Sequence, residues 1–121
     1  MKTVKITTDN KISVIDENFK DFRDIQRAIG GHFEAVHTQL MSDYFKDPSV
    51  IILVDEEGLI KELPLNPVGS ALCKGIIAGD LIFAQVEGED IVAPDDVEKL
   101  KERLLHTFIG LQEEVDMNET E

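Results

Sequence analysis

The chain has 121 residues, of which 42% are hydrophobic and 31% are charged, and its formal net charge is −13. A chain of this size can bury one core without disulfides or a metal, so we expect a single domain. The negative charge repels polyanionic surfaces, which argues against direct binding of nucleic acids or anionic membranes.

Cysteine content and the apolar runs indicate the cellular compartment. Cys73 is the single cysteine, so an internal disulfide is excluded. The first residues alternate polar and apolar side chains and lack the apolar stretch of a signal peptide. The longest strongly apolar run, residues 50–54, is too short to span a bilayer. These features predict a cytoplasmic protein.

Residues 4–7 alternate polar and apolar side chains, turn-forming residues follow at 9–11, and residues 12–15 alternate in part, which predicts an N-terminal hairpin. A helix is predicted next, over residues 19–29, with Asn18 as its N-cap and Asp21 in its first turn. Apolar residues recur there at spacings of three and four, which marks one buried face. Gly30 and Gly31 are expected to end this helix.

Residues 32–37 are predicted to form a strand, with Phe33, Ala35 and His37 on one side and the remaining residues on the other. We expect a loop over residues 41–49. The unbroken apolar run at 50–54 indicates a central strand covered on both faces. A tight turn at 55–58 then predicts a hairpin with a returning strand at 59–63, which Pro64 ends.

Residues 66–75 are rich in Asn, Pro, Gly and Ser, so we expect a loop there. Residues 81–86 predict another central strand, with a turn at 87–90. A last helix is expected after Pro94, where Asp95 and Glu98 have the spacing of a capping box, and Gly110 is expected to end it. This order predicts an α+β fold with a mostly antiparallel sheet and two helices over residues 1–110, followed by an acidic, flexible tail at 111–121.

Three ordered pieces of the sequence carry a resemblance. They are Gly-Gly-His-Phe-Glu-Ala-Val at 30–36, Asp-Glu-Glu-Gly-Leu-Ile-Lys-Glu-Leu-Pro-Leu-Asn at 55–66, and Ile-Ala-Gly-Asp at 77–80. With these pieces the chain resembles a family of small proteins of unknown function from bacteriophages and bacterial mobile elements. The resemblance covers residues from about 30 to 90 and implies an accessory gene product in a bacterial host cytoplasm, with no established activity.

No catalytic or metal-binding motif stands out. His32, Glu34 and His37 are close in sequence, but strand alternation places His37 on the face opposite the other two. Cys73 has apolar neighbours, which favours a buried thiol over a nucleophile. Gly69 and Gly75 do not have the spacing of a phosphate-binding loop. We therefore predict no cofactor and no metal.

Seven residues are candidates for binding. Asn66 and Asp80 lie beside Pro or Gly at strand ends, where such side chains usually fix a turn but can also contact a ligand. Tyr44 and Phe45 are aromatic residues in a predicted loop, where they could anchor a partner or fold back onto the core. The remaining candidates are acidic: Glu34, Glu56 and Glu57.

Several functions are compatible with these features. The first is a non-enzymatic accessory protein that binds and modulates a host protein, such as a defence factor, through Tyr44, Phe45 and the acidic turn. A DNA mimic is a variant of this function, although interspersed Lys and Arg residues break up the negative charge. The alternatives are a binding module for a nucleotide-like ligand, held beside residues 66–75, and a hydrolase built on carboxylates such as Glu34 and Asp80. An unpaired edge of the N-terminal hairpin could also support a homodimer.

Overall fold

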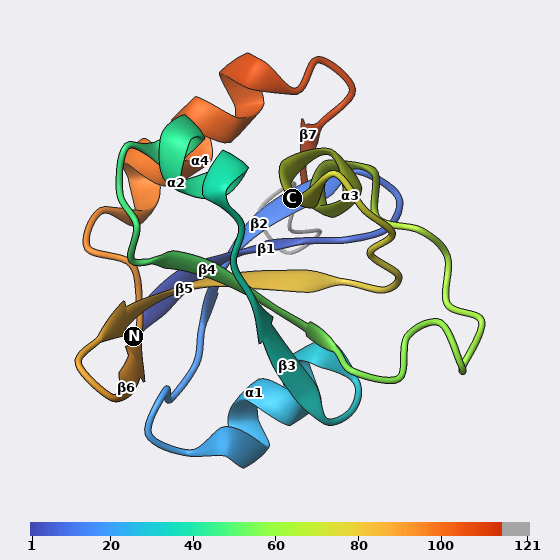
Figure 1. The fold of residues 1–121 in the computed structure, drawn as a ribbon, viewed down its shortest axis with the longest axis horizontal. Helices are drawn as coiled ribbons and strands as arrows, with labels where there is room; N and C mark the ends of the chain where they lie inside the picture. Colours follow the sequence, from blue (N-terminus) through green and yellow to red (C-terminus); the bar gives the residue numbers. More distant parts are fainter. Residues whose placement is uncertain (115–121) are drawn as a thin grey trace, which may run out of the picture.

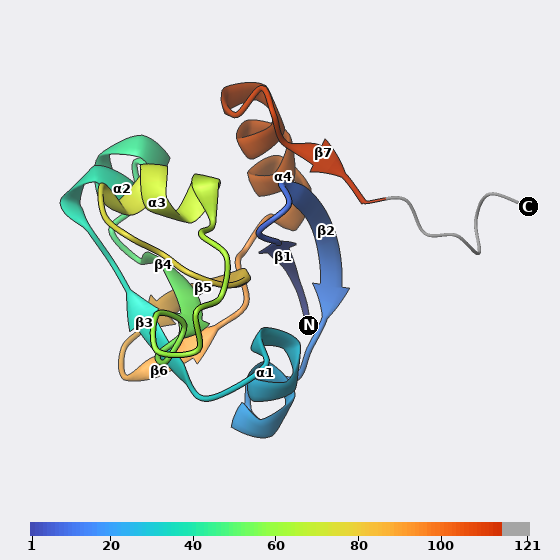
Figure 2. The same cartoon turned by 90° about the vertical axis from the view of Figure 1, so that its right-hand side faces the viewer.

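The computed structural model of the protein describes residues 1–114. One mixed sheet forms its centre, with one helix on one face and three helices on the other (Figures 1 and 2). The strands are β1 (Lys2–Ile6), β2 (Lys11–Asp16), β3 (Phe33–Val36), β4 (Val50–Asp55), β5 (Leu81–Glu87), β6 (Asp90–Val92) and β7 (Gln112–Glu113). The helices are α1 (Phe22–Ile29), α2 (Gln39–Phe45), α3 (Pro67–Cys73) and α4 (Val97–Thr107).

The strands follow the spatial order β3-β4-β5-β1-β2-β7, and β6 pairs with the second half of β5. Among the described strands, β2 and β7 are parallel and the other pairs are antiparallel. The first strand of the chain therefore lies inside the sheet, between β5 and β2. No helix within residues 1–114 is long and apolar enough to cross a membrane.

The two faces of the sheet carry two separate cores. Along β4, alternate side chains point to opposite faces, so Ile52 packs with α2, α3 and α4 while Ile51 and Leu53 pack with α1. The same alternation in β5 sends Phe83 to the first core and Ile82 to the second. All six residues of β4 are buried, which explains why the sequence there is apolar without a break.

The structure confirms the α+β class, the mostly antiparallel sheet and the N-terminal hairpin. It also confirms the predicted strands at 32–37, 50–54 and 81–86, each within one or two residues. The edges of the hairpin are only partly unpaired: within residues 1–114, the stretch 13–16 of β2 has no strand partner on its outer side. β1 pairs with β5 through Lys5 and Ile6, and β2 pairs with β7 through Lys11 and Ile12.

Two predicted helix starts need small corrections. α1 begins at Phe22, three residues late, because the Asp21 carboxylate caps it by accepting from the amide of Arg23. Asn18 instead accepts from the amide of Lys20 in the preceding turn. α4 is capped by Asp96, which accepts from the amide of Lys99, so Asp95 lies one residue before the cap. α4 ends at Thr107, before Gly110.

The prediction of two helices is wrong, because two of the predicted loops contain short helices. Residues 41–49 include most of α2, whose N-cap is Thr38. Residues 66–75 contain α3, in which Asn66 is the N-cap and Pro67 occupies the first turn. Both helices have seven residues and cover the same face of the sheet as α4.

The predicted strand at 59–63 is also wrong. The two neighbours of β4 are β3 and β5, so the apolar run does not form a hairpin with the segment that follows it. Residues 57–62 form consecutive turns that project from the sheet, on the right of Figure 1. Leu65 makes a single antiparallel bridge to Ala78.

The sheet continues beyond the predicted domain boundary at residue 110. Leu111 is buried in the core beside α4, and Gln112 and Glu113 pair with β2. The described part of the fold therefore runs to residue 114. The part of the predicted flexible tail from residue 115 onward lies outside the described residues.

Candidate functional site

A buried carboxylate at the end of β4 organises the turns that follow it. One oxygen of Asp55 accepts from the amide of Glu57 at 2.8 Å, and the other accepts from the ammonium of Lys61 at 2.7 Å. Burial raises the pKa of the Asp55 carboxyl, but the hydrogen bonds from Lys61 and Glu57 outweigh burial and leave this pKa below its ordinary value. Asp55 therefore stays ionised and fixes the start of the projecting loop.

Backbone hydrogen bonds hold the rest of this loop, residues 56–65, which we call the braced loop. The amide of Lys61 donates to the carbonyl of Glu57 at 2.9 Å, and the amide of Leu63 donates to the carbonyl of Gly58 at 3.0 Å. The loop is tied to the chain before β5 by the amide of Gly79, which donates to the carbonyl of Pro64 at 2.8 Å. It is thus a fixed projection with internal hydrogen bonds.

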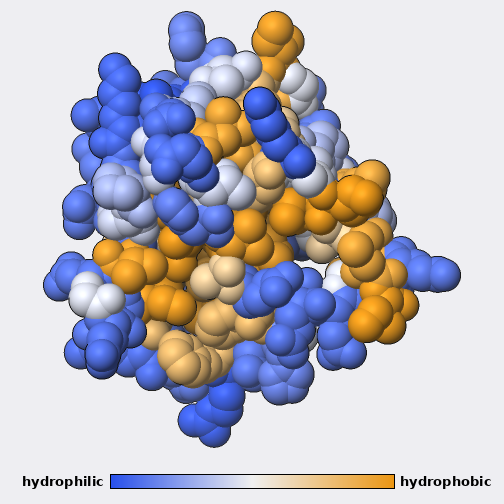
Figure 3. Space-filling view, viewed as in Figure 1, coloured by the Kyte–Doolittle hydropathy of each residue, from blue (hydrophilic) through white to orange (hydrophobic). Residues whose placement is uncertain are grey.

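Four large aliphatic side chains on and beside the braced loop face solvent. Leu59 is 61% exposed, Ile60 79%, Leu65 55% and Ile76 64%. The bridge between Leu65 and Ala78 brings the end of the loop beside the segment that carries Ile76. We call these four residues the loop patch; the apolar surface on the right of Figure 3 lies where the braced loop projects in Figure 1.

The three acidic candidates lie near this region. Glu56 and Glu57 are exposed at the base of the braced loop, and Glu34 is exposed on β3. Among the ion pairs of residues 1–114, none includes these three carboxylates. Each can therefore meet a cationic group of a partner without first breaking an internal ion pair.

The side chain of Asn66 forms hydrogen bonds within the fold. It is fully buried, its side-chain oxygen accepts from the amide of Gly69, and its side-chain amide donates to the carbonyls of Ile6 and Gly79, each at 3.1 Å. These three bonds join α3, β1 and the turn before β5. These bonds indicate that Asn66 fixes the turn; the sequence allowed either this role or contact with a ligand.

Asp80 is also bonded within the fold. One carboxylate oxygen accepts from the amide of Thr8 at 3.2 Å, and the other lies 3.6 Å from the ammonium of Lys5. Glu34 does not approach it, because β4 lies between β3 and β5. The structure therefore does not bring together the two carboxylates that a hydrolase would need around one water.

Tyr44 and Phe45 lie in α2 and turn toward the core. The Phe45 ring packs edge-on against the buried ring of Phe83, with centroids 5.8 Å apart. The Tyr44 hydroxyl is 2.5 Å from the hydroxyl of Thr107, and the Arg103 guanidinium lies over the Tyr44 ring at 4.6 Å. This aromatic pair therefore joins α2 to α4 and β5.

The side chains of His32, His37 and Cys73 have different surroundings. His32 pairs with the Gln26 side chain, and His37 lies 2.7 Å from the hydroxyl of Ser42. Burial raises the pKa of the Cys73 thiol, so this thiol is less ionised than a free cysteine. Among the described residues, no group of three His, Cys, Asp or Glu side chains could hold a metal ion.

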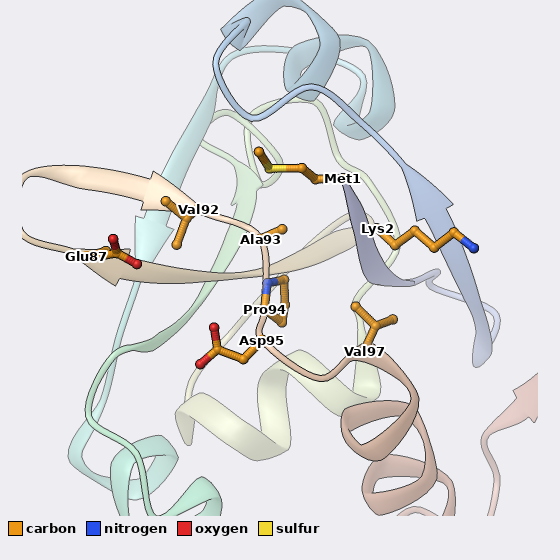
Figure 4. A pocket seen from close by; sticks show the side chains of 8 residues that line it. All are labelled: Met1, Lys2, Glu87, Val92, Ala93, Pro94, Asp95 and Val97. Atoms are coloured by element: carbon orange, nitrogen blue, oxygen red, sulfur yellow. The ribbon is translucent and has the colours of Figure 1, made fainter.

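A shallow groove of about 480 Å³ opens where β1 diverges from β5 (Figure 4). Polar and apolar atoms contribute about equally to its lining, which comes from eight residues: Met1, Lys2, Glu87, Val92, Ala93, Pro94, Asp95 and Val97. In Figure 4 the ammonium group of Lys2 points away from the other labelled residues. The Lys2 ammonium is therefore not directed into the groove, where it could help to select a small ligand.

The loop patch was missed by the sequence reasoning, which assigned Leu59 and Ile60 to a strand. A signal against that strand was present, because Leu59-Ile60-Lys61-Glu62 does not alternate apolar and polar residues. Leu65 and Ile76 carry no comparable signal, since an exposed aliphatic residue in a short connection looks like a buried one. Their exposure became clear only from the structure.

Comparison with known proteins identifies a family. Residues 1–105 match the model of a domain of unknown function, DUF3846, which includes β1, β2 and most of α4 in addition to the stretch on which the resemblance was based. No curated protein and no solved structure matches the chain. Because the match covers the sheet through β6 and all four helix starts, the chain belongs to the DUF3846 family.

Proposed function

We propose that this protein is a non-enzymatic binding protein, and that it docks on a host protein through the loop patch. The observation that carries this proposal is the exposure of Leu59, Ile60, Leu65 and Ile76 on a loop that is held in place by hydrogen bonds. Contiguous exposed apolar surface on a soluble protein commonly marks a contact site. Burying each such side chain contributes roughly 1–2 kcal/mol, so four can supply much of the free energy of a specific contact.

The braced loop also lowers the cost of binding. A flexible loop would lose conformational entropy when it docks, whereas one already fixed by the Asp55–Lys61 pair loses less. Glu56 and Glu57 at its base add a charged rim beside the apolar centre, which is the usual arrangement of a protein interface. The partner that fits this surface presents an apolar pocket bordered by Lys or Arg.

We further propose that the host is bacterial and that the protein is an accessory product of a bacteriophage or mobile element. The three sequence pieces at 30–36, 55–66 and 77–80 support this context, and the second piece contains the whole braced loop. A ligand-binding module has less support. The segment at 66–75 forms α3, whose Val68 and Leu72 are buried against the sheet where a pocket was expected.

The test compares captured proteins between matched baits. The wild-type protein and the double variant Leu59→Ser/Ile60→Ser are immobilised and exposed to the same bacterial lysate. The control bait is Ile109→Ser, since Ile109 is 98% exposed beyond the end of α4 and is not part of the loop patch. Circular dichroism and thermal unfolding confirm that all three baits are folded.

The proposal requires a host protein that binds both the wild type and the Ile109 variant. Its capture by the double variant should fall about tenfold or more, which corresponds to a loss of about 1.4 kcal/mol in binding free energy. Equal capture by all three baits would contradict the role of the loop patch. A fourth bait, Tyr44→Ala, separates the aromatic pair from the loop patch, because Tyr44 lies in α2.

A further inference from the structure

The outer side of β3 has no strand partner within residues 1–114. β3 pairs with β4 on one side, in the register that aligns Phe33 with Asp55 and Val36 with Ile52. On its other side the sheet ends (Figure 2). A free edge exposes a row of backbone donors and acceptors that can pair with another strand.

The hydrogen-bond pattern shows which backbone groups of β3 point outward. The amide of Glu56 donates to the carbonyl of His32, so these two residues form a hydrogen-bonded pair. Because such pairs alternate in an antiparallel ladder, Glu34 bonds to β4 while Phe33 and Ala35 direct their N–H and C=O groups away from it. Outside the strand ladders, no backbone–backbone hydrogen bond of the described residues involves Phe33 or Ala35.

The opposite side of β4 gives the same alternation independently. The amide of Val86 donates to the carbonyl of Ser49, which places the hydrogen bonds between β4 and β5 at Ile51 and Leu53. The even-numbered residues of β4 are thus left to bond β3. The outward direction of Phe33 and Ala35 therefore follows from two separate contacts.

Two copies of β3 can pair without placing like charges opposite each other. In an antiparallel pair centred on Ala35, Phe33 of one copy lies opposite His37 of the other, and Glu34 lies opposite Val36. β3 ends at Val36, and Thr38, two residues further on, again has extended dihedral angles. The residues with outward backbone groups are then the ones that form the hydrogen-bonded pairs.

An exposed aromatic side chain beside this edge supports the same arrangement. Phe22 is 58% exposed, and its ring packs edge-on against the ring of Phe33, with centroids 5.6 Å apart. Phe33 and Ala35 face the α1 side of the sheet together with Phe22. A second copy paired at this edge would cover part of this apolar surface.

We propose that β3 is a self-association edge, through which two copies of this chain pair antiparallel about a two-fold axis at Ala35. The sheets of both copies then form one continuous sheet, with the two α1 helices on the same face. This proposal does not depend on the loop patch, because it uses the outer edge of β3. Failure of one proposal therefore leaves the other standing.

Charge determines how this association responds to salt. Each copy carries a net charge of −13, so two copies repel each other over distances that salt screens. The dimer is expected to become stronger when salt rises from about 0.05 M to about 0.5 M. A cationic peptide strand bound at the same edge would show the opposite dependence.

Sedimentation equilibrium over a range of protein concentrations tests the proposal with three variants of one residue. Ala35→Lys places two ammonium groups opposite each other, and Ala35→Pro removes the outward N–H without removing a bond to β4. Ala35→Thr is the control, because threonine keeps the N–H and suits a strand. The wild type and Ala35→Thr should dimerise, and the other two should weaken the dimer tenfold or more.

Crosslinking tests the position of the axis. In a Cys73→Ser background, Ala35→Cys brings two cysteines to a Cα separation of about 5.5 Å, which a disulfide can span. Lys46→Cys, at an exposed position after α2, is the control. Faster crosslinking at residue 35 supports the proposal. The proposal is overturned if the wild type stays monomeric at all salt concentrations. It is also overturned if the dimer persists in Ala35→Lys and does not crosslink at residue 35. A monomeric wild type would mean that the edge is free for a strand of another protein.

Discussion

The ammonium group of Lys61 lies 2.7 Å from the carboxylate of Asp55, whose side chain is 2% exposed. This pair joins the buried end of β4 to the middle of the braced loop. Asp55→Asn is expected to destabilise the protein by about 1–3 kcal/mol, because it replaces a charge-assisted hydrogen bond by a neutral one beside Lys61. Urea unfolding measures the change. Glu56→Gln, one residue along and exposed, should leave stability within about 0.5 kcal/mol.

The same pair predicts a pH dependence. Asp55 has a lower pKa in the folded protein than its ordinary value of 3.8, so its ionised form stabilises the fold above pH 3.8. This contribution is lost as the pH falls from 3.8 through the folded pKa. The difference in unfolding free energy between the wild type and Asp55→Asn should therefore be largest near neutral pH and shrink below pH 3.8. A difference that grows on acidification would contradict the assignment.

Removal of Asn66 should be more damaging than loss of an ordinary helix cap. Asn66→Ala removes the cap of α3 and leaves the carbonyls of Ile6 and Gly79 without their donor in a buried site. The expected loss is roughly 2–4 kcal/mol, from about 1 kcal/mol for the cap and 1–3 kcal/mol for the unpaired groups. Asp96→Ala, which removes the exposed cap of α4, is the matched control and should cost about 1 kcal/mol.

Gly58 controls how closely the braced loop approaches the chain before β5. A Cβ at this position would lie 2.5 Å from the carbonyl oxygen of Ala78, which is backbone and cannot rotate away. Gly58→Ala is expected to destabilise the protein by about 1–3 kcal/mol and to shift the loop. Amide NMR shifts at residues 57–65 and 76–79 would show the displacement. Gly75→Ala is the control, because its Cβ would have its nearest neighbour at 3.8 Å.

Strands β1 to β5 and helices α1 and α4 were predictable because each has a local sequence signal, whereas β6 and β7 were not predicted. β4 and β5 are covered on both faces, and a strand covered on both faces needs apolar residues without alternation. α1 and α4 have capping aspartates, Asp21 and Asp96, within three residues of the predicted starts. Such signals depend on residues that are neighbours in the sequence, so they can be recognised without knowing which strands and helices pack together.

The short helices and the projecting loop were not predicted, for different reasons. α2 and α3 have seven residues each, too few for a helical period to emerge, although Thr38 and the Asn66–Pro67 pair were available as start signals. Residues 59–63 were assigned to a strand because the turn residues at 55–58 indicated a hairpin with a returning strand. Which strand lies beside β4 depends on contacts between residues distant in sequence. Because β3 takes this place, Leu59 and Ile60 are exposed to solvent.

The candidate site was predictable only in its acidic part. Glu34, Glu56 and Glu57 are exposed in the region where the structure places the braced loop and β3. Tyr44 and Phe45 were selected because aromatic residues in a polar loop suggest a contact, but that segment is helical and both rings pack toward the core. The composition of a segment shows which groups are available, while their direction depends on the packing of the whole chain.

The place of β1 inside the sheet has a consequence for how the protein is made. β1 is synthesised before the other described strands, and its neighbours Leu81 and Ile82 are synthesised long after it. During translation β1 can pair with β2, but its other side must wait until β5 has emerged. A nascent chain stalled before β5 should remain open to proteases, and the described sheet can be completed only after β7 has emerged.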